Sequence, residues 1–418
     1  MERRWPPPTT AGSSPLHASL TNYNPFEMEY FSLLVSRLSL TEWILGGLLL
    51  FFFLVQLFFY LVVYYKPYRH EKKQGSATVP EDALPPVSVI IPSKNNSEEL
   101  ALNLPFILEQ DYPQYEVIVV NSGSTDETDM VLKAAGMKYP HLYHTYVPKE
   151  ADSVNEKKLA LTIGIKAAKY EQLLFTEAYC KPCSSGWIRE YGKAFASGKE
   201  ILLGFNRLTI GKKVHMRRFI RFDNLIHHLK FLSMALLGKP YMGVGRNMGY
   251  SKELFYRHKG FSSILHIDGG EDDLFINRIA KGARTGVMLS PDSITETHGI
   301  DSFFTWRSLK SKYLYTKQFY KGVAPHLMRM EIVTRYIFYL ILATSITLSL
   351  TTASWLLTGF TLLLFLVRYG VMSRVLKRTS RLLDGGGYHL HLLLYDLFQP
   401  FNNFRFRQYA NKRNRYHR

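Results

Sequence analysis

The segment from Val87 to Thr128 constrains the fold more than any other part of this chain. It contains two apolar runs rich in β-branched residues, VSVII and EVIVV, and each ends in a cluster of small polar residues. Strands with both faces covered by helices have this composition, so the runs predict neighbouring parallel strands. Ligands of open α/β sheets bind at the carboxyl ends of the strands, which predicts a site beside the two polar clusters.

These paired motifs resemble the N-terminal pattern of the family 2 glycosyltransferases, which usually read VSVIIPxYNE and then DDGSxDxT. Here Lys94 and Asn96 take the Tyr and Glu positions, Asn121-Ser122 replace the acidic pair, and Asp126 is retained. The resemblance implies an α/β domain of the GT-A type, a Rossmann-like fold that binds a nucleotide-sugar such as a UDP- or GDP-sugar. It assigns donor binding to residues at the two strand ends: Pro92, Ser93, Asn95, Asn121, Ser124 and Asp126.

The residues after the second strand predict a helix from Thr125 to Lys138, with Ser124 or Thr125 as its cap. A lysine pair opens the next predicted helix, from Lys157 to Lys169. Lys157 and Lys158 stand in EKKLALTIGIKAAK, which resembles the GKxxALNxGIxxA segment of the family. The resemblance implies that one of the two ammonium groups neutralises the donor diphosphate as a point charge. A solvated helix start is the alternative explanation of the pair.

The predicted strand that follows ends in a motif where the family usually has Asp-x-Asp. Glu177 keeps a carboxylate at the first position, but Tyr179 replaces the second aspartate, which in the family helps to hold a divalent metal. Because Mg²⁺ and Mn²⁺ need hard oxygen ligands, a neutral phenol argues against a metal. Glu177 alone, or Glu177 with the later His298, remains the candidate metal site.

The segment GGEDDLF resembles the part of the family that supplies the general base. Counting back from Leu274 places the base at Glu271, with Asp272 as the second candidate and Asp273 beside it. Inverting transfer needs such a base to take the proton of the acceptor hydroxyl. Acidic residues also favour helix N-termini, and both explanations apply if the base stands at a helix start.

Two further segments resemble parts of the family that touch donor or acceptor. Arg246 and Asn247 follow a glycine-rich turn in YMGVGRNMG. The QxxRW motif of processive members corresponds here to Leu309–Tyr313, in which Lys312 is a candidate for facing the diphosphate. Because three positions of that motif have changed, the resemblance does not favour processive synthesis. A basic helix lying on a membrane is the alternative explanation of this segment.

Three apolar runs predict membrane spans. The first, Trp43 to Tyr65, has no charged residue and is long enough to cross a hydrocarbon core of ~30 Å. Two shorter runs begin at Tyr336 and Trp355 and predict a hairpin. We therefore expect, in chain order, a disordered segment (1–40), a transmembrane helix (41–66), a linker (67–86), a GT-A domain (87–325), a transmembrane hairpin (332–370) and a basic cytoplasmic or interfacial tail (371–418).

The formal charge of +18 is explained by basic residues that flank these runs. Among them are Arg335 before the second run and Arg368 after the third. The positive-inside rule then predicts a multi-pass protein of the inner (cytoplasmic) membrane, with its soluble domain in the cytoplasm. The tail FRFRQYANKRNRYHR interleaves arginine with aromatic residues, but next to membrane spans it indicates anionic lipid rather than nucleic acid.

Two functions from different classes follow from this sequence. The first is a membrane-bound inverting glycosyltransferase that moves a sugar to a membrane lipid, a lipid-linked glycan or another membrane-proximal glycan. The second is a catalytically degenerate protein that keeps the fold and acts as a binding or scaffold subunit of a membrane complex. The changes at Asn121-Ser122, Tyr179 and Leu309–Tyr313 favour the second.

Overall fold

The computed structural model describes residues 36, 38–73, 79–147, 155–280, 283–383, 385–388 and 391–416. The chain divides into two compact units. One comprises Met1–Phe51 and Leu340–Phe365, and the other comprises Phe52–Tyr339 and Leu366–Arg418. The predicted disordered segment lies almost entirely outside the described residues, as do five residues of the predicted linker.

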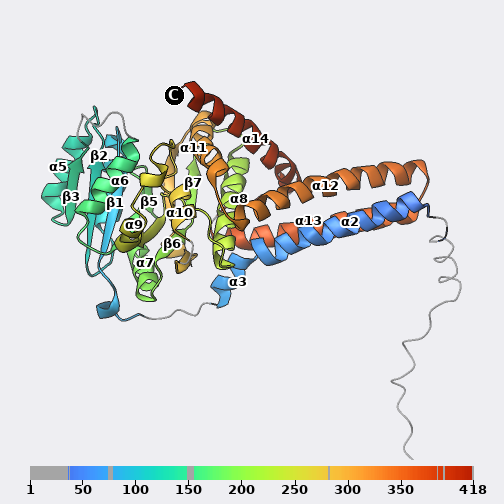
Figure 1. The fold of residues 1–418 in the computed structure, drawn as a ribbon, viewed down its shortest axis with the longest axis horizontal. Coiled ribbons are helices and arrows are strands. Elements are labelled where there is room, and N and C mark those ends of the chain that lie inside the picture. Colours follow the sequence, from blue (N-terminus) through green and yellow to red (C-terminus); the bar gives the residue numbers. More distant parts are fainter. Residues whose placement is uncertain are drawn as a thin grey trace, which may run out of the picture. The chain divides into compact units, whose positions relative to one another are not determined.

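A seven-stranded mixed sheet forms the centre of the larger unit (Figure 1). Its order is β3-β2-β1-β4-β8-β6-β9, and β8 runs antiparallel to both of its neighbours. The predicted parallel pair is confirmed, because β1 and β2 pair in parallel over seven residues. The strands are β1 (Val87–Ser93), β2 (Tyr115–Asn121), β3 (Leu142–Tyr146), β4 (Gln172–Phe175), β6 (Ile201–Gly204), β8 (Met248–Ser251) and β9 (Thr285–Met288).

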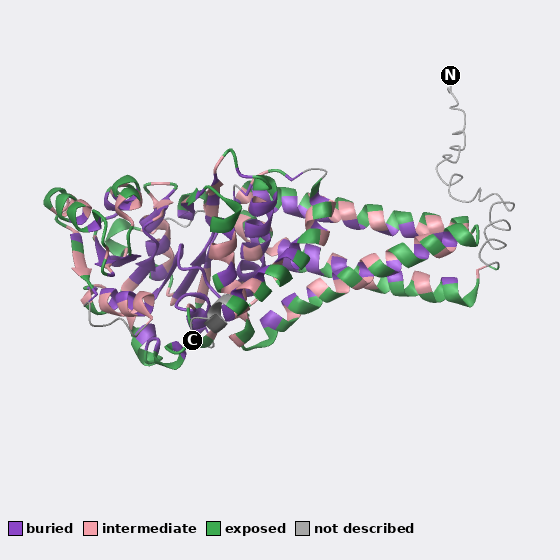
Figure 2. Cartoon of the chain, turned by 90° about the horizontal axis from the view of Figure 1, so that it is seen from above, coloured by how far each residue is buried: buried purple, intermediate pink, exposed green. Residues whose placement is uncertain are grey.

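Both faces of β1 are buried, which explains its unbroken apolar run. Ile90 belongs to the hydrophobic cluster on one face of the sheet, while Val89 and Ile91 belong to the cluster on the other face. Side chains alternate along a strand, so a strand covered on both sides needs apolar residues at every position. Figure 2 shows this buried interior at the sheet.

A smaller three-stranded sheet continues from the end of β4. Its order is β5-β10-β7, with β5 (Cys180–Pro182), β7 (Asn206–Ile210) and β10 (Thr295–Ile300). The strand β10 pairs antiparallel with β5 and parallel with β7. His298, one of the predicted metal ligands, stands on β10 of this smaller sheet.

Helices pack on the sheets and extend beyond them. They are α2 (Leu40–Phe58), α3 (Lys66–Lys73), α4 (Ser97–Leu108), α5 (Thr128–Lys138), α6 (Glu156–Ala167), α7 (Trp187–Ala196), α8 (Arg217–Leu236), α9 (Lys252–Arg257), α10 (Asp273–Ile279), α11 (Phe303–Thr316), α12 (Val323–Thr351), α13 (Trp355–Leu382) and α14 (Leu392–Tyr416). The short helical turns are η1 (Phe59–Tyr64), η2 (Glu81–Ala83), η4 (Ser262–Ile264), η5 (Pro291–Ser293) and η6 (Lys317–Phe319).

The start of α5 corrects one expectation. The sequence predicted a helix from Thr125 with Ser124 or Thr125 as its cap, but the helix begins at Thr128 and has no side-chain cap. Ser124 and Thr125 instead hydrogen-bond to the loop after β1. A polar group that is engaged by a neighbouring loop cannot also cap the helix.

Three helices are long and apolar enough to cross a membrane, within the described residues. They span Leu40–Lys73, Val323–Thr351 and Trp355–Leu382, which agrees with the three predicted spans.

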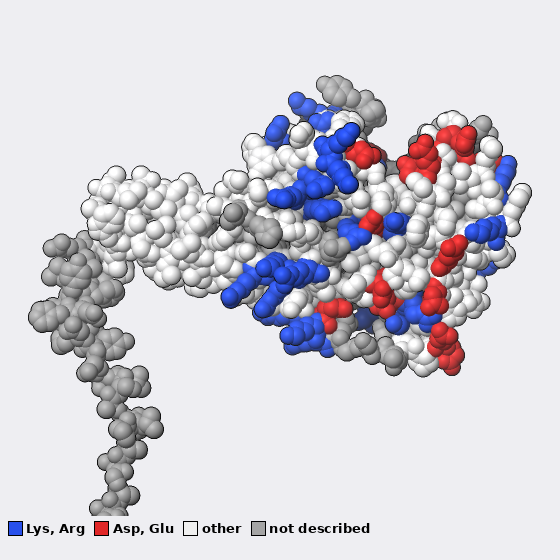
Figure 3. Space-filling model, turned by 180° about the vertical axis from the view of Figure 1, so that it is seen from behind, with Lys and Arg blue, Asp and Glu red and all other residues white. Residues whose placement is uncertain are grey.

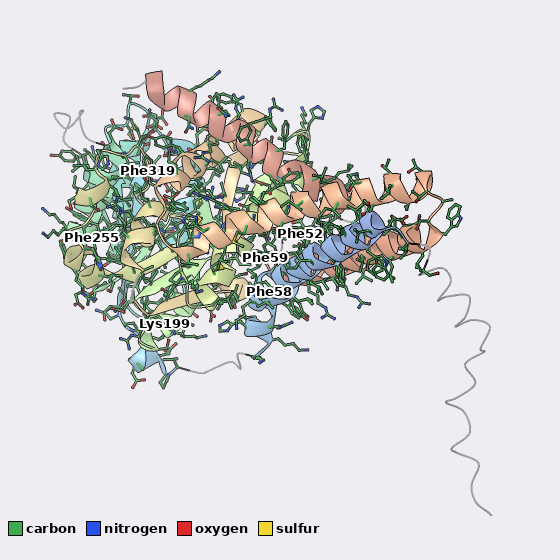
Figure 4. The ribbon with its side chains drawn as sticks, turned by 45° about the vertical axis from the view of Figure 1, so that its right-hand side comes forward. Phe52, Phe58, Phe59, Lys199, Phe255 and Phe319 are labelled. Carbon is green, nitrogen blue, oxygen red and sulfur yellow. The ribbon has the colours of Figure 1, made fainter. Side chains whose placement is uncertain are left out.

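Phe58 and Phe59, next to each other at the end of α2, differ sharply in exposure: Phe58 is 53% exposed, whereas Phe59 is 4% exposed (Figure 4).

Two of the basic residues expected at the membrane surface are buried instead. Arg335 and Arg368 are 2% and 0% exposed. Both form ion pairs with Asp396, with nitrogen–oxygen distances of 2.9 Å, and Arg335 also pairs with Glu331. Two acidic partners from α12 and α14 compensate these charges inside the protein, while the orientation of the spans stays a prediction.

Candidate active site

The two polar clusters predicted at the strand ends lie side by side. Ser93, at the end of β1, is the register partner of Asn121, at the end of β2. The backbone N–H of Ser122 donates to the carbonyl oxygen of Ser93 at 2.8 Å. The neighbouring strand β4 ends at Phe175 and leads directly to Glu177. Three parallel strand ends therefore form one edge of the site, as the parallel pairing requires.

Most predicted donor-binding residues at this edge tie the two loops together. The side-chain oxygen of Asn95 accepts from the N–H of Thr125 at 2.8 Å, and the N–H of Asn95 donates to Ser124 Oγ at 2.9 Å. Asp126 accepts from the N–H groups of Ser97 and Thr128 at 2.9 and 3.1 Å. The hydrogen bonds from Thr128 and Ser97 hold the pKa of Asp126 below its usual value.

Lys157 joins two carboxylates that are far apart in the sequence. Its Nζ atom lies 2.5 Å from Glu177 Oε1 and 2.9 Å from Glu271 Oε1. Lys157 stands in the first turn of α6, Glu177 follows β4, and Glu271 precedes α10. Both glutamate side chains are 9% exposed and are shielded from water, whereas the side chain of Lys157 is 31% exposed. This ion triad unites residues that the sequence assigned to diphosphate, metal and general base.

Within the triad, Lys157 and Glu271 shift each other's pKa and so favour each other's charged form. Burial alone would raise the pKa of Glu271, but the ammonium of Lys157 outweighs burial and lowers that pKa to about 2. Burial alone would lower the pKa of Lys157, but the carboxylates of Glu177 and Glu271 outweigh burial and raise that pKa well above its usual value. Lys157 and Glu271 are therefore both ionised at neutral pH. A carboxylate with so low a pKa is a weak base while the lysine holds it.

One oxygen of Glu271 is not engaged. Oε2 is buried and has no hydrogen-bond partner among the described residues. A buried carboxylate oxygen without a partner is costly, so its persistence indicates a functional position. This atom is the one through which Glu271 is able to accept a proton from a bound hydroxyl.

The two aspartates after Glu271 are engaged in holding the site. Asp272 Oδ2 accepts from the N–H of Gly245 and from the hydroxyl of Tyr313, both at 2.8 Å. Asp273 accepts from the hydroxyls of Thr316 and Tyr320. Burial and the neighbouring Asp272 raise the pKa of Asp273 well above its usual value. Both aspartates therefore connect the start of α10 to its surroundings.

Arg246 and Lys312 are two further cations near the ion triad. Arg246 is buried, and its Nε and Nη1 atoms have no hydrogen-bond partner among the described residues. Its guanidinium carbon lies 5.9 Å from the centroid of the Tyr313 ring. Lys312 lines the same cavity as Lys157 and Glu271. These unused donors are suited to an anionic ligand.

The space around the triad is small in this structure. One cavity of about 30 Å³ is lined by Lys157, Glu177, Glu271, Lys312 and Tyr313, among others. A second cavity of about 80 Å³ shares Lys157, Glu271 and Lys312. Pockets for ligands of nucleotide size occupy roughly 300–1,000 Å³, so binding such a ligand requires the site to open.

Two predicted donor-binding residues lie outside this group. Asn247 accepts from Trp187 and Tyr191 and donates to the carbonyls of Phe205 and Ser293, so its hydrogen bonds are all internal. The ammonium of Lys158 donates to the carbonyls of Ile264 and Ile267 at 2.8 and 2.5 Å. Those bonds fasten the η4 region to α6. Pro92, on β1, is a buried sheet residue opposite Val120.

The two predicted metal ligands have different partners. His298 Nε2 lies 2.8 Å from Glu296 Oε1, while the backbone N–H of His298 donates to the carbonyl oxygen of Tyr179 at 3.2 Å. The carboxylate of Glu177 is bound by Lys157, as is that of Glu271. Glu177 and Glu271 thus offer the hard oxygen atoms that a divalent cation needs, but an ammonium group occupies the space between them.

The sequence did not indicate that Tyr313, Thr316 and Tyr320 belong to the site. These three residues supply the hydroxyls that bind Asp272 and Asp273. Tyr313 and Thr316 stand one turn apart on α11, and that i, i+3 spacing is the signal that could have found them, whereas Tyr320 follows the η6 turn in extended backbone. Of these three residues the sequence singles out only Tyr313, which takes the position of the tryptophan in the QxxRW motif.

The fold and the strand-end site are similar to those of glycosyltransferases with a GT-A-like sheet core. Residues 51–184 match the family model described as glycosyl transferase family 21. That range contains β1, β2, Lys157 and Glu177, whereas Glu271 lies beyond it. The predicted resemblance to family 2-like glycosyltransferases and the predicted fold class are thereby confirmed.

Two curated glycosyltransferases are similar to parts of this chain in sequence, and a solved structure is similar to it in fold. The chain is 32% identical to glycosyltransferase AglE of Haloferax volcanii over 126 residues, 29% of this chain. It is 25% identical to a ceramide glucosyltransferase of Komagataella phaffii over 216 residues, 47% of this chain. Each match spans 40% of the relative's length. The mannosyltransferase PcManGT from Pyrobaculum calidifontis, solved with GDP-Man and Mn²⁺, is similar in fold with a TM-score of 0.51, 20% identity and coverage of 80% of this chain and 97% of its own.

Proposed function

We propose that this protein is a membrane-bound inverting glycosyltransferase that moves a sugar from a nucleotide-sugar to a lipid-linked or membrane-proximal glycan. The observation that carries the proposal is the ion triad, in which Lys157 lies between Glu177 and Glu271 while Glu271 Oε2 is unpaired. A base beside a cation is what transfer from a diphosphate requires. The fold neighbour holds GDP-Man, and the ceramide glucosyltransferase is named for a lipid acceptor.

Glu271 is the general base in the proposed reaction. Its Oε2 accepts the proton of the acceptor hydroxyl while the oxygen of that hydroxyl bonds to the anomeric carbon of the donor sugar. The bond between that carbon and the diphosphate oxygen breaks, and the electron pair leaves with the nucleoside diphosphate. The attack comes from the side opposite the leaving group, so the anomeric configuration inverts.

Lys157 neutralises the leaving diphosphate in this proposal, together with Lys312 and Arg246. Once Lys157 binds the phosphate oxygens, its hold on Glu271 weakens, so the pKa of Glu271 rises and the carboxylate becomes a better base. Because Lys157 lies between the carboxylates of Glu177 and Glu271, and Tyr179 replaces the second aspartate, we assign charge neutralisation to side-chain cations rather than to Mg²⁺ or Mn²⁺.

The proposed location is the inner membrane, with the site on the cytoplasmic side. Three candidate spans and the basic residues that flank them support this orientation under the positive-inside rule. Figure 3 shows Lys and Arg gathered mainly over one part of the molecular face and Asp and Glu mainly over another. The basic part is suited to anionic lipid head groups.

The test measures release of nucleoside diphosphate by the purified full-length protein from a panel of UDP-, GDP- and dTDP-sugars. Glu271→Gln is expected to lower kcat by about 10²–10⁴-fold, as for loss of a general base. Glu253→Gln, the same change at an exposed carboxylate on α9, is the matched control and should leave kcat unchanged. If no donor in the panel binds or turns over, the proposal is wrong.

Metal removal is a separate arm of that experiment. With charge neutralisation by Lys157, EDTA should leave the rate within about twofold, and added Mn²⁺ should not raise it further. A rate that collapses in EDTA and returns with Mn²⁺ would show that a metal enters the site despite Tyr179.

The second candidate function is a binding or scaffold subunit without turnover. It is favoured by the ion triad itself, because Lys157 holds Glu271 ionised and only weakly basic. The same panel separates the two functions. A nucleotide-sugar that raises the thermal midpoint, but from which no nucleoside diphosphate is released with any acceptor tried, would support the scaffold.

A further inference from the structure

A large apolar groove lies apart from the strand-end site, between the end of α11, the first half of α12 and α14. Its volume is about 1,000 Å³, at the upper end of the range of ligand pockets. Figure 1 shows α14 beside α11, and the hydroxyl of Tyr336 on α12 donates to the carbonyl of Leu397 on α14 at 2.8 Å. All residues of the groove belong to the larger unit.

The long walls of the groove are apolar and exposed. Val333 and Tyr336 on α12 are 56% and 38% exposed, and Leu394, Phe401 and Phe404 on α14 are 54–63% exposed. On each helix the lining residues recur at i, i+3, i+4 and i+7, so each helix turns one continuous apolar stripe into the groove. Because α12 is a candidate membrane span, its exposed apolar residues are expected to face lipid, so a lipid chain is the occupant that suits the groove.

Three cations share the same groove. Lys317, Arg329 and Arg407 come from η6, α12 and α14 and all line the groove. Among the described residues, none of the three has a carboxylate within salt-bridge distance. Burial and the nearby charges, including Arg329 and Arg407, lower the pKa of Lys317 to about 7. Like charges gathered without a counterion repel one another, and a bound anion would relieve that repulsion.

One helix connects this groove to the catalytic pocket. Lys312, Tyr313 and Thr316 of α11 line the pocket around Glu271, while Leu314 and Lys317, at the end of the same helix, line the groove. Thr316 binds Asp273, and Lys317 is the next residue. A head group held at Lys317 therefore lies at the end of the helix that forms one wall of the proposed reaction site.

We propose that the groove binds a long-chain lipid phosphate, with its phosphate among Lys317, Arg329 and Arg407 and its hydrocarbon chain along the apolar stripes of α12 and α14. This proposal rests on the proposed function and names its acceptor class: a glycan or sugar linked to a lipid through phosphate or diphosphate. The charge excludes a neutral lipid as the preferred occupant, because a hydroxyl cannot compensate three cations.

Equilibrium binding to the full-length protein in a neutral maltoside detergent tests the groove without any donor. The probes are farnesyl phosphate, farnesol and inorganic phosphate, which separate the contributions of chain and charge. Farnesyl phosphate should bind at least about tenfold more tightly than either of the others. The double variant Arg329→Ala/Arg407→Ala changes only exposed side chains and should weaken farnesyl phosphate binding at least about tenfold.

Arg405→Ala is the matched control, since Arg405 is exposed on α14 but does not line the groove. It should bind farnesyl phosphate as the wild type does. Equal binding of farnesol and farnesyl phosphate, or equal losses in the double variant and in Arg405→Ala, would overturn the proposal. Nucleotide-sugar binding is measured on the same samples. Donor turnover without lipid-phosphate binding refutes the groove alone, and lipid-phosphate binding without any donor binding refutes the proposed function alone.

Discussion

Lys157 is the residue on which the site depends. Its single ammonium group compensates Glu177 and Glu271, both nearly inaccessible to water. The sequence indicated that either Lys157 or Lys158 faces a diphosphate, but it could not choose between them. Successive residues on a helix point about 100° apart, so only the packing of α6 decided that Lys158 turns to backbone carbonyls and Lys157 to the carboxylates.

Replacing Lys157 by glutamine removes the cation proposed to neutralise the diphosphate. We expect kcat to fall by about 10²–10³-fold, the usual effect of removing one donor that stabilises developing negative charge. Lys166→Gln, at an exposed position of the same helix, should leave kcat unchanged. Steady-state kinetics with the best donor of the panel checks this, and a Lys157→Gln variant within threefold of wild type would contradict it.

The pH dependence of stability reports on Glu271. The folded state lowers the pKa of this carboxyl from 4.5 to about 2, so its ionised form stabilises the protein above about pH 4.5. This stabilisation is lost as the pH falls through that window. The thermal midpoint of the wild type should therefore drop further between about pH 5.5 and about pH 3 than that of Glu271→Gln. Equal drops in the two proteins would mean that the pKa of Glu271 is not lowered.

At the scale of elements, the strands were predictable and the loop contacts were not. β1 and β2 follow from unbroken β-branched runs, because only strands buried on both faces need apolar residues at every position. The loops that follow them pair Asn95 with Thr125 and Ser97 with Asp126 across about thirty residues of sequence. No local pattern contains such partners, which is why the predicted helix cap at Ser124 or Thr125 was wrong.

Gly164 lets α6 lie directly on β1 and β2. A Cβ atom at this position would come within 2.7 Å of Ile90 Cγ2 and 3.2 Å of Val120 Cγ2. We expect Gly164→Ala to lower the free energy of unfolding by about 1–3 kcal/mol through overpacking, despite the better helix propensity of alanine. On α5, Gly136→Ala meets nothing closer than 3.9 Å and should be neutral or stabilising. Denaturant unfolding of both variants checks this, and similar stabilities would contradict close packing at Gly164.

At the scale of the whole molecule, a buried ion network links the helices of the larger unit. Asp396 on α14 binds Arg335 on α12 and Arg368 on α13, and Glu331 binds Arg335 and Lys230 of α8. The sequence placed the two arginines at the membrane surface, because flanking charge is normally exposed there. Glu331 is only four residues from Arg335, but Asp396 lies 61 residues from Arg335 and 28 from Arg368, so the full network arises only when the helices pack together.

Replacement of Asp396 measures how much this ion network contributes to the stability of the protein. Asp396→Asn leaves Arg335 and Arg368 buried with less than their full compensation, and we expect it to cost about 3–5 kcal/mol of stability. Asp129→Asn, which breaks the exposed pair with Lys133 on α5, should cost less than about 1 kcal/mol. Thermal unfolding in one detergent measures both. A loss at Asp396 no larger than that at Asp129 would show that the network does not stabilise the fold.

By itself the sequence determined the resemblance to glycosyltransferases, the two central strands, the three apolar spans and the acidic segment that contains Glu271. Each of these depends on the spacing of residues close together in the chain, where periodicity and side-chain chemistry act directly. Only the tertiary structure decided that Lys157 joins Glu177 to Glu271, that His298 pairs with Glu296 and that three cations without a carboxylate partner in the described part of the chain border an apolar groove. Those relations join distant parts of the chain, and burial sets their charges only once the parts have packed together.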